Sequence, residues 1–349
     1  MNKHRGKWIA ACCLVIVLLI ASCIGYFNRG ALAAWGFDAF LSDKLENQLA
    51  DTYQPLTDRP DPSAEEPVVK VAEEPFSLLM MGVDARPGQK AGRSDTLIYT
   101  VVRPTDGNAL MVSIPRDTYA EIVGKDKQDK ITHAYAYGGP EMAVNSVEKL
   151  LDAPIGHYAS INFEGFVQMV DTLGGIALPI TEDIVNKGAD HEKFTIKAGQ
   201  SSYSGEEALN YVRYREDAGG DVSRTERNRI FLEALMHKAT SLQQWNHITE
   251  LLGIVGDNFR TDLQPSELTG LAKQFLQTEL HIRSYTLHGT GARMGKQNLW
   301  YFVADEQDLN DVRTTIARWM DPATSAADLT IPGEEAADAP ASSDRPAAE

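Results

Sequence analysis

Cysteine is scarce in this chain of 349 residues, and its placement excludes two kinds of site. The three cysteines are Cys12, Cys13 and Cys23, so none lies beyond the first short segment of the chain. The remainder therefore contains neither a disulfide framework nor a thiolate metal site.

The common motifs of nucleophilic and zinc catalysis are missing as well. The sequence contains no G-x-S-x-G turn, no Walker loop and no H-E-x-x-H, and its eight histidines do not pair at metal-ligand spacing. His133 is the one histidine beside a candidate loop, where a buried or capping role is the simpler interpretation. We therefore expect neither a serine or cysteine nucleophile nor a zinc centre.

Positive charge is also in short supply, since the formal net charge is −16. Residues 38–75 carry ten acidic and three basic side chains and residues 321–349 carry seven and one, whereas residues 1–37 carry four basic and no acidic ones. The section between them, 76–320, is net negative too. Nucleic acid is therefore not an expected partner, because binding it depends on broad neutralisation of phosphates.

One apolar run, Trp8–Phe27, is about 20 residues long and can cross a bilayer. The basic residues that precede it are Lys3, Arg5 and Lys7. This bias predicts a cytoplasmic tail at 1–7, a retained transmembrane anchor at 8–27, and a single-pass cell-membrane protein with its domain extracellular. A cleaved signal peptide and lipidation at Cys23 are the alternatives.

Composition divides the rest of the chain into a stem, a folded domain and a tail. Residues 28–75 combine a helical pattern at Phe37–Leu49 with an acidic linker rich in Pro and Glu. Residues 321–349 are rich in Ala, Ser, Pro and acidic residues, and we expect them to be disordered. The folded domain is expected at 76–320.

Apolar runs of strand length alternate with helical patterns within this domain. The expected strands are 76–83, 97–102, 109–114 and 281–287, and the expected helices are 140–151, 163–173, 205–211, 222–239, 265–277 and 306–320. Such interleaving predicts an α/β fold: a three-layer α/β/α domain with a central mixed sheet, whose loops at the strand ends carry the site.

Arginine is concentrated in this acidic domain. The nine between Gly82 and Arg229 are Arg86, Arg93, Arg103, Arg116, Arg213, Arg215, Arg224, Arg227 and Arg229, and the aspartates beside them are Asp84, Asp95, Asp117 and Asp221. Guanidinium groups match phosphate oxygens bidentately. Carboxylates supply what Mg²⁺ needs when it shares a phosphate with the protein. The pattern predicts a site for a diphosphate and a metal.

Two aspartates are the candidate metal ligands. Asp84 follows the first expected strand and Asp95 precedes the second, so both can face one site from adjacent strands. Each could instead cap a loop, but the interleaved Arg86 and Arg93 favour metal or phosphate binding. The segment is not an EF-hand, because Arg86 and Gly88 occupy alternate ligand positions.

The remaining arginines can reach the same sheet edge. Arg116 follows the third expected strand, while Arg213 and Arg215 alternate, so an extended segment would point both toward one diphosphate. On the next helix Arg224 and Arg227 are one turn apart and can share a face. Surface salt bridges and a solvated charged face are the simpler alternatives for these last two pairs.

The motifs that contain these residues occur in the order seen in the LytR-CpsA-Psr family, which the chain resembles over about 76–320. The matching motifs are Gly82–Arg86, Arg93–Thr96, Ser113–Asp117, His133–Gly139, Asp171–Gly175, Ala208–Arg215 and Arg224–Arg227. Two positions depart from the usual pattern, which often has Asn where His133 stands and Gln where Asn228 stands. The segment Gln200-Ser-Ser-Tyr203 also replaces the more usual Gln-x-Leu.

The resemblance implies a phosphotransferase of cell wall biogenesis in mainly Gram-positive bacteria. Such an enzyme moves a glycopolymer, such as wall teichoic acid or capsule, from its undecaprenyl-diphosphate carrier to peptidoglycan and releases undecaprenyl phosphate. It implies Mg²⁺ on Asp84 and Asp95, which Mn²⁺ could replace. The implied diphosphate ligands are Arg93, Arg116, Arg213, Arg215, Arg224 and Arg227.

The resemblance also implies roles in catalysis and an apolar tunnel for the polyprenyl chain. Arg116 would stabilise developing charge, and either Asp95 or Asp117 would accept the proton of the attacking hydroxyl. The candidate tunnel residues, which could equally be ordinary core, are Phe163, Phe166, Val167, Met169, Val170, Leu232, Leu235 and Met236. A lipid-diphosphate pyrophosphatase and a non-catalytic binder or envelope regulator are the rival functions. The presence of both aspartates favours catalysis.

Overall fold

The computed structural model describes residues 46, 47, 49–57, 59, 73–84, 92–188, 193–214, 220–239, 258–278 and 280–334. The expected anchor at 8–27, Arg86 and Arg215 lie outside these residues, as do the side chains of Arg224 and Met236. No helix within the described ranges is both long and apolar enough to cross a membrane.

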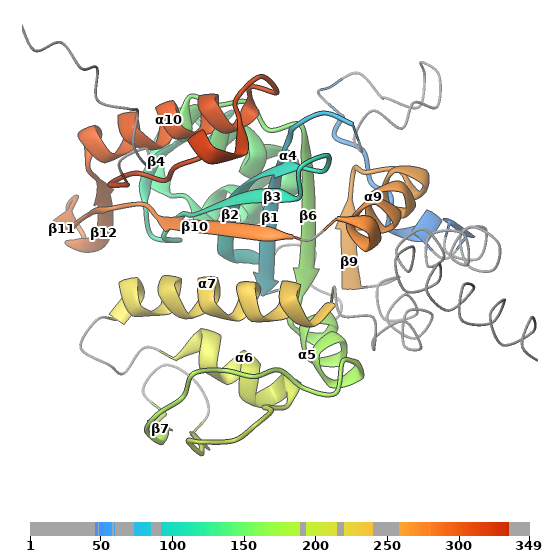
Figure 1. The fold of residues 1–349 in the computed structure, drawn as a ribbon. Helices are drawn as coiled ribbons and strands as arrows, with labels where there is room; N and C mark the ends of the chain where they lie inside the picture. The colour runs from blue at the N-terminus through green and yellow to red at the C-terminus, as the bar shows by residue number, and fades with distance from the viewer. Residues whose placement is uncertain are drawn as a thin grey trace, which may run out of the picture.

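A six-stranded mixed sheet in the order β10-β3-β2-β1-β6-β9 forms the centre of the domain (Figure 1). Its strands are β1 (Phe76–Asp84), β2 (Arg93–Arg103), β3 (Asn108–Ser113), β6 (His157–Asn162), β9 (Phe259–Thr261) and β10 (His281–Thr286). β1 pairs in parallel with β6 and β3 with β10, whereas the β1–β2, β2–β3 and β6–β9 pairs are antiparallel. The expected mixed sheet is confirmed.

Side chains alternate along β1, so its two faces meet different layers. Leu79, Met81 and Val83 are almost fully buried on one face, whereas Met80 and Gly82 are partly buried on the other. The same alternation in β2 places Leu97 on the first face and Ile98 on the second. The sheet therefore separates two distinct interiors.

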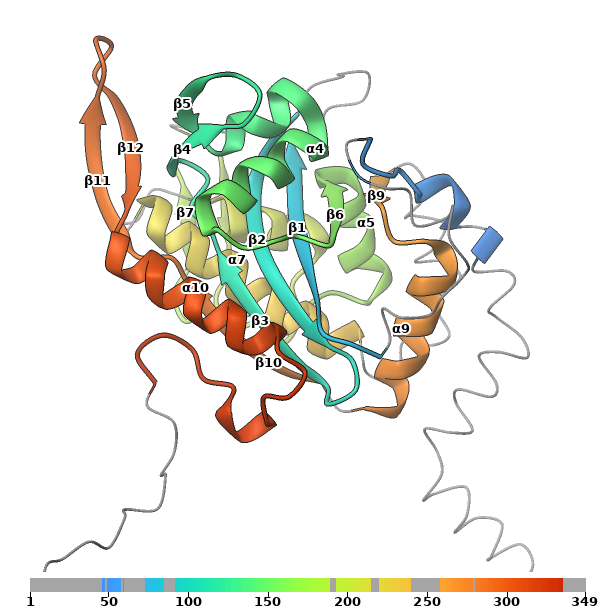
Figure 2. The ribbon, with the colours of Figure 1, turned by 90° about the horizontal axis from the view of Figure 1, so that it is seen from above.

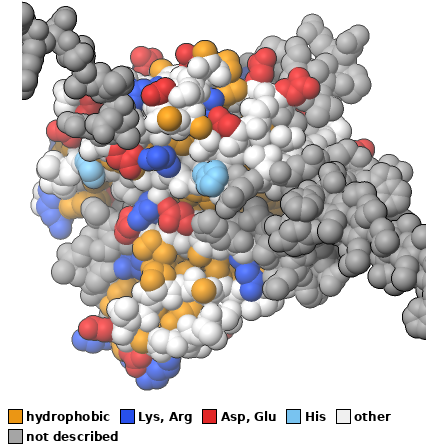
Figure 3. All heavy atoms as spheres, viewed as in Figure 1, with side chains coloured by type: hydrophobic (Ala, Val, Ile, Leu, Met, Phe, Trp, Pro, Cys, Tyr) orange, Lys and Arg blue, Asp and Glu red, His pale blue; other side chains and the backbone are white. Residues whose placement is uncertain are grey.

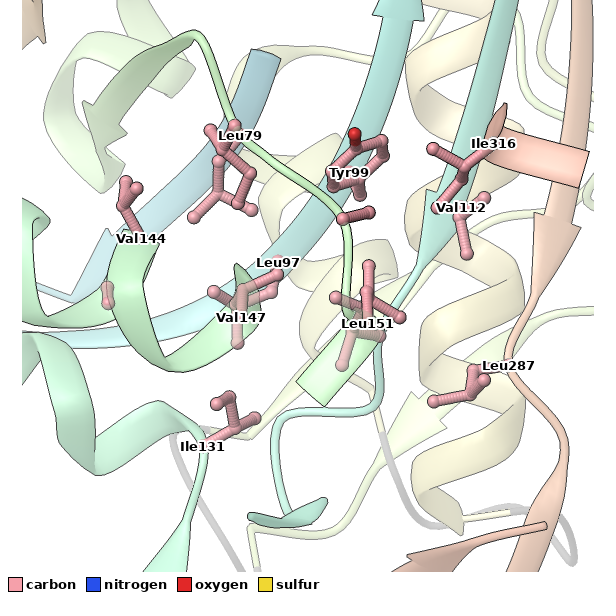
Figure 4. Packing of buried hydrophobic residues seen from close by; sticks show 14 of the residues in the cluster. Leu79, Leu97, Tyr99, Val112, Ile131, Val144, Val147, Leu151, Leu287 and Ile316 are labelled. Carbon is pink, nitrogen blue, oxygen red and sulfur yellow. The ribbon is translucent and has the colours of Figure 1, made fainter. Parts of the chain in front are cut away.

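The first face is covered by α4 (Thr132–Leu151) and α10 (Glu306–Met320). Figure 4 shows strand residues such as Leu79 and Val112 meeting Val144 and Val147 of α4 and Ile316 of α10. All five belong to one buried hydrophobic cluster. This half of the molecule is a conventional packed core.

Helix α4 is longer than the helix expected at 140–151, and it is kinked. Gly138 and Gly139 depart from helical geometry, and Gly139 has a φ of 68°, which glycine adopts without strain. Pro140 then starts the second segment, where a missing N–H costs least. The kink presents the short first segment, with His133 and Tyr137, beside the loops at the sheet edge.

The second face is covered by α5 (Phe163–Thr172), α6 (Gly205–Arg213) and α7 (Gly220–Ala239), while α9 (Pro265–Gln277) lies at the far end (Figures 1 and 2). Asn162 caps α5 by accepting from the Gly165 N–H at 2.8 Å. Ser204 and Glu207 form a capping box that starts α6. These helices make the third layer of the fold.

Three hairpins were not predicted from the sequence, and the strands of two of them are only three or four residues long. They are β4 (Tyr119–Ile122) with β5 (Lys127–Lys130), β7 (Ile184–Asn186) with β8 (Phe194–Ile196), and β11 (Gly289–Met294) with β12 (Leu299–Ala304). β12 adjoins β4 through a bridge between Thr118 and Phe302. Figure 2 shows the first and last hairpins at the same end of the molecule.

Two boundary expectations need correction. Disorder from 321 onward is wrong for 321–334, where Leu329 is buried and the Trp319 indole N–H donates to the Thr330 carbonyl at 3.0 Å. The buried Arg103 holds this segment by donating to the carbonyls of Asp321 and Thr324, and it also donates to that of Trp319 near the end of α10. The stem also joins the domain, since Leu56 belongs to the packed core.

Candidate active site

An irregular step in β2 shapes the sheet edge where the candidate residues meet. Gly82 pairs with Thr96, but the next residue of β1, Val83, pairs with Ser94, so Asp95 is an extra residue on β2. Such a β-bulge shifts the following side chains to the opposite face. Arg93 therefore stands directly across from Asp84 and on the same face of the sheet.

Arg116 links the bulge to the loop after β3. Its Nη1 lies 2.5 Å from Asp95 Oδ1, and its Nε lies 3.8 Å from Asp117 Oδ2. Lys130, at the end of β5, places its Nζ 3.0 Å from Asp117 Oδ1. All four side chains are largely buried. The structure thus brings the predicted Arg116, Asp95 and Asp117 into one charged network.

Two neighbouring carboxylates are available to a cation. Within the described residues the side chain of Asp84 makes no hydrogen bond or ion pair, and Asp95 gives only Oδ1 to Arg116. No group of three His, Cys, Asp or Glu side chains within these ranges could hold a metal by itself. Two carboxylates nevertheless fit Mg²⁺, which usually takes one or two and completes its shell with water and substrate phosphates.

Arg213 reaches this edge from the helical layer, although not from the extended segment that the sequence suggested. It is the last residue of α6, which buries Ala208, Tyr211 and Val212. That buried stripe, together with the capping box, keeps Tyr211–Arg213 helical. The guanidinium carbon of Arg213 lies 4.9 Å from the ring centroid of Phe163, the residue that follows β6.

Arg227 occupies a more enclosed position than a phosphate ligand was expected to have. It is only 9 % exposed and donates to the backbone carbonyl of Tyr214, the C-cap of α6. The rings of Tyr214 and Tyr211 lie 5.2 and 6.0 Å from its guanidinium carbon. These contacts tie α7 to the C-terminus of α6, and thereby hold Arg213 in place.

Asn228, one residue further along α7, bridges the helix to the sheet. Its Nδ2 donates to Thr96 Oγ1 at 3.1 Å. Both residues line a cavity of about 280 Å³ between the second face of the sheet and α5–α7. They mark its polar end, beside the bulge at Asp95.

The rest of the cavity wall is overwhelmingly apolar. Of the tunnel residues predicted from the sequence, Phe163, Phe166, Met169, Leu232 and Leu235 line it. Val170 instead belongs to the buried cluster between α5 and α6, and Val167 does not line the cavity. Figure 3 shows that hydrophobic side chains also reach the surface over α6 and α7.

The sequence pattern of the LytR_cpsA_psr family matches residues 42–318. The chain belongs to the LytR-CpsA-Psr family. Polyisoprenyl-teichoic acid–peptidoglycan teichoic acid transferase TagU of Bacillus subtilis (strain 168) is 34% identical over 313 residues, which cover 89% of this chain and 97% of that one. Family membership is thus confirmed over nearly the whole length of a relative.

Solved structures of relatives share the fold. The crystal structure of B. subtilis TagU is 36% identical, with a TM-score of 0.54 over 71% of this chain and 98% of that one. A structure of TagT bound to LI-WTA is 26% identical, with a TM-score of 0.58 over 77% of this chain and 99% of that one.

Two residues of this site, Lys130 and Thr96, were not predicted from the sequence. Lys130 was passed over because a lysine at the end of an unrecognised short strand looks like any surface lysine. In the sequence Thr96 is only one member of a motif, whereas in the structure its hydroxyl accepts a hydrogen bond from Asn228 at the cavity wall. The available signal in the sequence was its position directly after Asp95, a predicted site residue.

Proposed function

We propose that this protein transfers a teichoic acid or similar glycopolymer from a polyisoprenyl-diphosphate carrier to peptidoglycan. The observation that carries this proposal is the meeting of an apolar cavity with a network of arginines and carboxylates at one sheet edge. A lipid diphosphate has the same two-part chemistry. The name of the TagU relative and the ligand of the TagT relative support it.

The polyisoprenyl chain of the donor would enter the cavity between the sheet and α5–α7. Burying an isoprenoid there is favourable at roughly 25 cal/mol per Å² of apolar surface. The diphosphate would then lie at the polar end, beside Thr96 and Asn228. Arg93, across from Asp84, and Arg213, which lies against Phe163 of the cavity wall, would contact its oxygens.

Arg116 would act on the charge that develops during transfer. A hydroxyl of peptidoglycan attacks the phosphorus nearest the glycopolymer, its new P–O bond replacing the bond to the bridging oxygen. Undecaprenyl phosphate leaves with that oxygen. Phosphoryl transfer of this kind depends mainly on positioning and charge neutralisation, which a largely buried guanidinium provides effectively.

The proton of the attacking hydroxyl would pass to Asp95 or Asp117. Both carboxylates contact Arg116, and Asp117 also contacts Lys130, so both are held in position beside the proposed reaction centre. Asp95 lies on the bulge beside Thr96 and the cavity. We favour it for this reason.

We further propose that Asp84 and Asp95 hold Mg²⁺, or Mn²⁺ in its place. The cation would neutralise phosphate charge on the donor. The domain would act on the outer face of the cell membrane, tethered by the apolar run at 8–27. The rival pyrophosphatase would use the same groups with water as the nucleophile.

The test is reconstitution with the full-length chain in detergent. A shorter fragment starting near residue 70 would lose Leu56 from the core, and one ending at 322 would lose Leu329. The protein is incubated with a polyisoprenyl-diphosphate glycan donor, Mg²⁺ and short peptidoglycan strands. Mass spectrometry should find glycan joined to peptidoglycan, together with released polyisoprenyl phosphate.

Two variants assign the chemistry to these residues. Arg116→Ala should fold normally but turn over on the order of 100-fold more slowly, as loss of a transition-state donor does. Asp84→Asn should lose both transfer and the dependence on added Mg²⁺. Arg283→Ala removes an exposed arginine paired with Glu334 and serves as the control. Phosphate release without joined product would support the pyrophosphatase instead.

A further inference from the structure

A group of aromatic and charged side chains lies beside the active-site network, on the side of the sheet away from the cavity. Its members are Lys125, Lys127, Asp129, Lys130, Tyr137 and Tyr301, and we call them the hairpin patch. They come from the β4–β5 hairpin, the first segment of α4 and β12. Apart from Lys130, which contacts Asp117, the proposed chemistry does not use this patch.

Tyr137 is the most exposed part of the patch. It is 41% exposed, and among the described residues only Val185 and Leu299 are comparably exposed large hydrophobic side chains. Its hydroxyl donates to Asp129 Oδ2 at 2.9 Å, and Lys127 Nζ lies 2.8 Å from the same hydroxyl. The Nζ atoms of Lys127 and Lys125 lie 4.2 and 5.8 Å from its ring centroid. The ring is therefore held in one orientation while remaining open to solvent.

Asp129 stays ionised at the centre of the patch. Partial burial acts to raise the pKa of its carboxyl, but hydrogen bonds from Lys127, the Lys130 backbone, Tyr137 and His133 outweigh it and hold that pKa well below its usual range. His133 Nδ1 lies 3.0 Å from its Oδ1. A carboxylate fixed beside an exposed tyrosine ring can accept hydrogen bonds from hydroxyl groups.

The patch is continuous with the active-site network. The Lys130 N–H donates to Asp129 Oδ1 at 2.8 Å, while its Nζ reaches Asp117. That Nζ also lies 5.7 Å from the ring centroid of Tyr301, which packs edge-on against Tyr119 at 5.1 Å. Polar contacts thus run without a break from Tyr137 to Asp117, the neighbour of Arg116.

The cavity and the patch approach the network from opposite sides. The cavity lies between the sheet and α5–α7, whereas β4 and β5 pack with α4 on the other layer. A two-substrate transfer needs the donor and the acceptor to reach the phosphorus from different directions. The structure supplies two such approaches that meet at Arg116.

We propose that the hairpin patch binds the acceptor, a glycan strand that carries peptide stems with free carboxylates. This inference rests on the proposed transferase function. The Tyr137 ring offers an apolar face with a polar edge, which suits the C–H face of a sugar and its hydroxyls. Lys125 and Lys127 would pair with stem carboxylates, and such complementary charge selects the partner.

The test measures acceptor kinetics in the full-length protein at saturating donor, with uncross-linked peptidoglycan strands of defined length. Tyr137→Ala should raise the KM for strands about tenfold and leave kcat within about twofold. Tyr137→Phe keeps the ring and should stay within about twofold of the wild type. Thermal unfolding of each variant checks the fold.

Lys125 provides an independent test of the patch, because it is exposed and its replacement does not threaten folding. Lys125→Gln should raise the KM about threefold for stem-bearing strands and leave the KM unchanged for strands whose stems have been removed by an amidase. Tyr137→Ala should weaken both kinds of strand. Lys197→Gln, at an exposed lysine directly after β8, is the matched control.

The outcomes separate this inference from the function on which it rests. If the wild type performs transfer and Tyr137→Ala has an unchanged acceptor KM, the hairpin patch does not bind the acceptor, whereas the proposed transferase function is retained. Polyisoprenyl phosphate release without any joined product in the wild type would overturn both. A raised KM in Tyr137→Ala that Tyr137→Phe does not share would establish the patch.

Discussion

The two faces of the central sheet are built from the same strands but are packed differently. On the side of α4 and α10, large side chains fill the space between layers, and the core residues are almost fully buried. On the side of α5–α7, the small side chains of Gly82, Thr96 and Ala159 leave a cavity of about 280 Å³. One face stabilises the fold, and the other leaves room for a ligand.

The contrast is visible between adjacent residues. Leu79 and Met80 are neighbours in β1, yet Leu79 lies in the packed core and Met80 lines the cavity. Truncating a side chain in a close-packed interior lowers the stability of the fold. Truncating one that borders a cavity removes fewer contacts and should lower the stability less. The difference teaches that stability and binding can be altered separately in this domain.

The largest effect on stability is expected from this neighbouring pair. Leu79→Ala should lower the free energy of unfolding by about 2–5 kcal/mol and leave transfer per folded molecule unchanged. Met80→Ala should cost clearly less stability but weaken donor binding. Urea denaturation and donor titration measure the two quantities. Equal losses of stability would show that the cavity face is packed as tightly as the other.

Adding volume tests the same comparison in reverse. Ala143→Phe overfills the packed face, where Ala143 is fully buried, and should lower the free energy of unfolding by about 1–3 kcal/mol. Ala159→Phe should project into the cavity, change stability by less than about 1 kcal/mol, and strongly reduce transfer. Thermal unfolding and the transfer assay report on each. Full transfer by Ala159→Phe would show that the donor does not bind in this cavity.

A smaller effect is expected at the polar end of the cavity. Thr96→Val deletes the acceptor of the Asn228 hydrogen bond and should cost about 1 kcal/mol. Asn228→Leu combined with Thr96→Val should recover part of the loss, because neither partner is then left unpaired. A double-mutant cycle measures the coupling. Strict additivity would mean that the bond does not couple α7 to the sheet.

The smallest effect is expected where the packed half ends, at Asp129. The pKa of this carboxyl is lowered from 3.8 by its donors, so the folded state favours the ionised form and gains stability from it above about pH 4. That contribution is lost as the pH falls below 3.8. Asp129→Asn should therefore be less stable than the wild type at pH 7, and the gap should narrow below pH 4. A gap that does not change with pH would contradict this.

Much of the framework could be predicted from the sequence because periodicity carries it. Helices α9 and α10 begin and end where the apolar spacing indicated, and strands β1, β2 and β3 contain the near-continuous apolar runs that predicted them, although β2 begins four residues earlier than expected. The hairpins were missed, since Lys127–Lys130 has no apolar alternation at all. Its strand exists because it pairs with β4, a contact that no local pattern encodes.

The site was predicted in part, for a similar reason. Residue type and order singled out Asp95 and Arg116, and the structure places them 2.5 Å apart. The setting of Arg227 was not foreseen, because its burial depends on how α6 and α7 pack. The role of Lys130 beside Asp117 depends likewise on a hairpin that brings it back to the sheet edge.

The extra residue in β2 reverses the alternation of side chains between the two faces of the sheet. From Thr96 to Arg103 the inward and outward positions follow one parity, and from Ser94 back to Arg93 they follow the other. A deletion of Asp95 would leave a regular ladder in which Ser94 still lies opposite Val83 and Arg93 still lies opposite Asp84. The extra residue therefore adds a carboxylate to the sheet edge without displacing the arginine across from Asp84, so these two groups of the site can be altered one at a time.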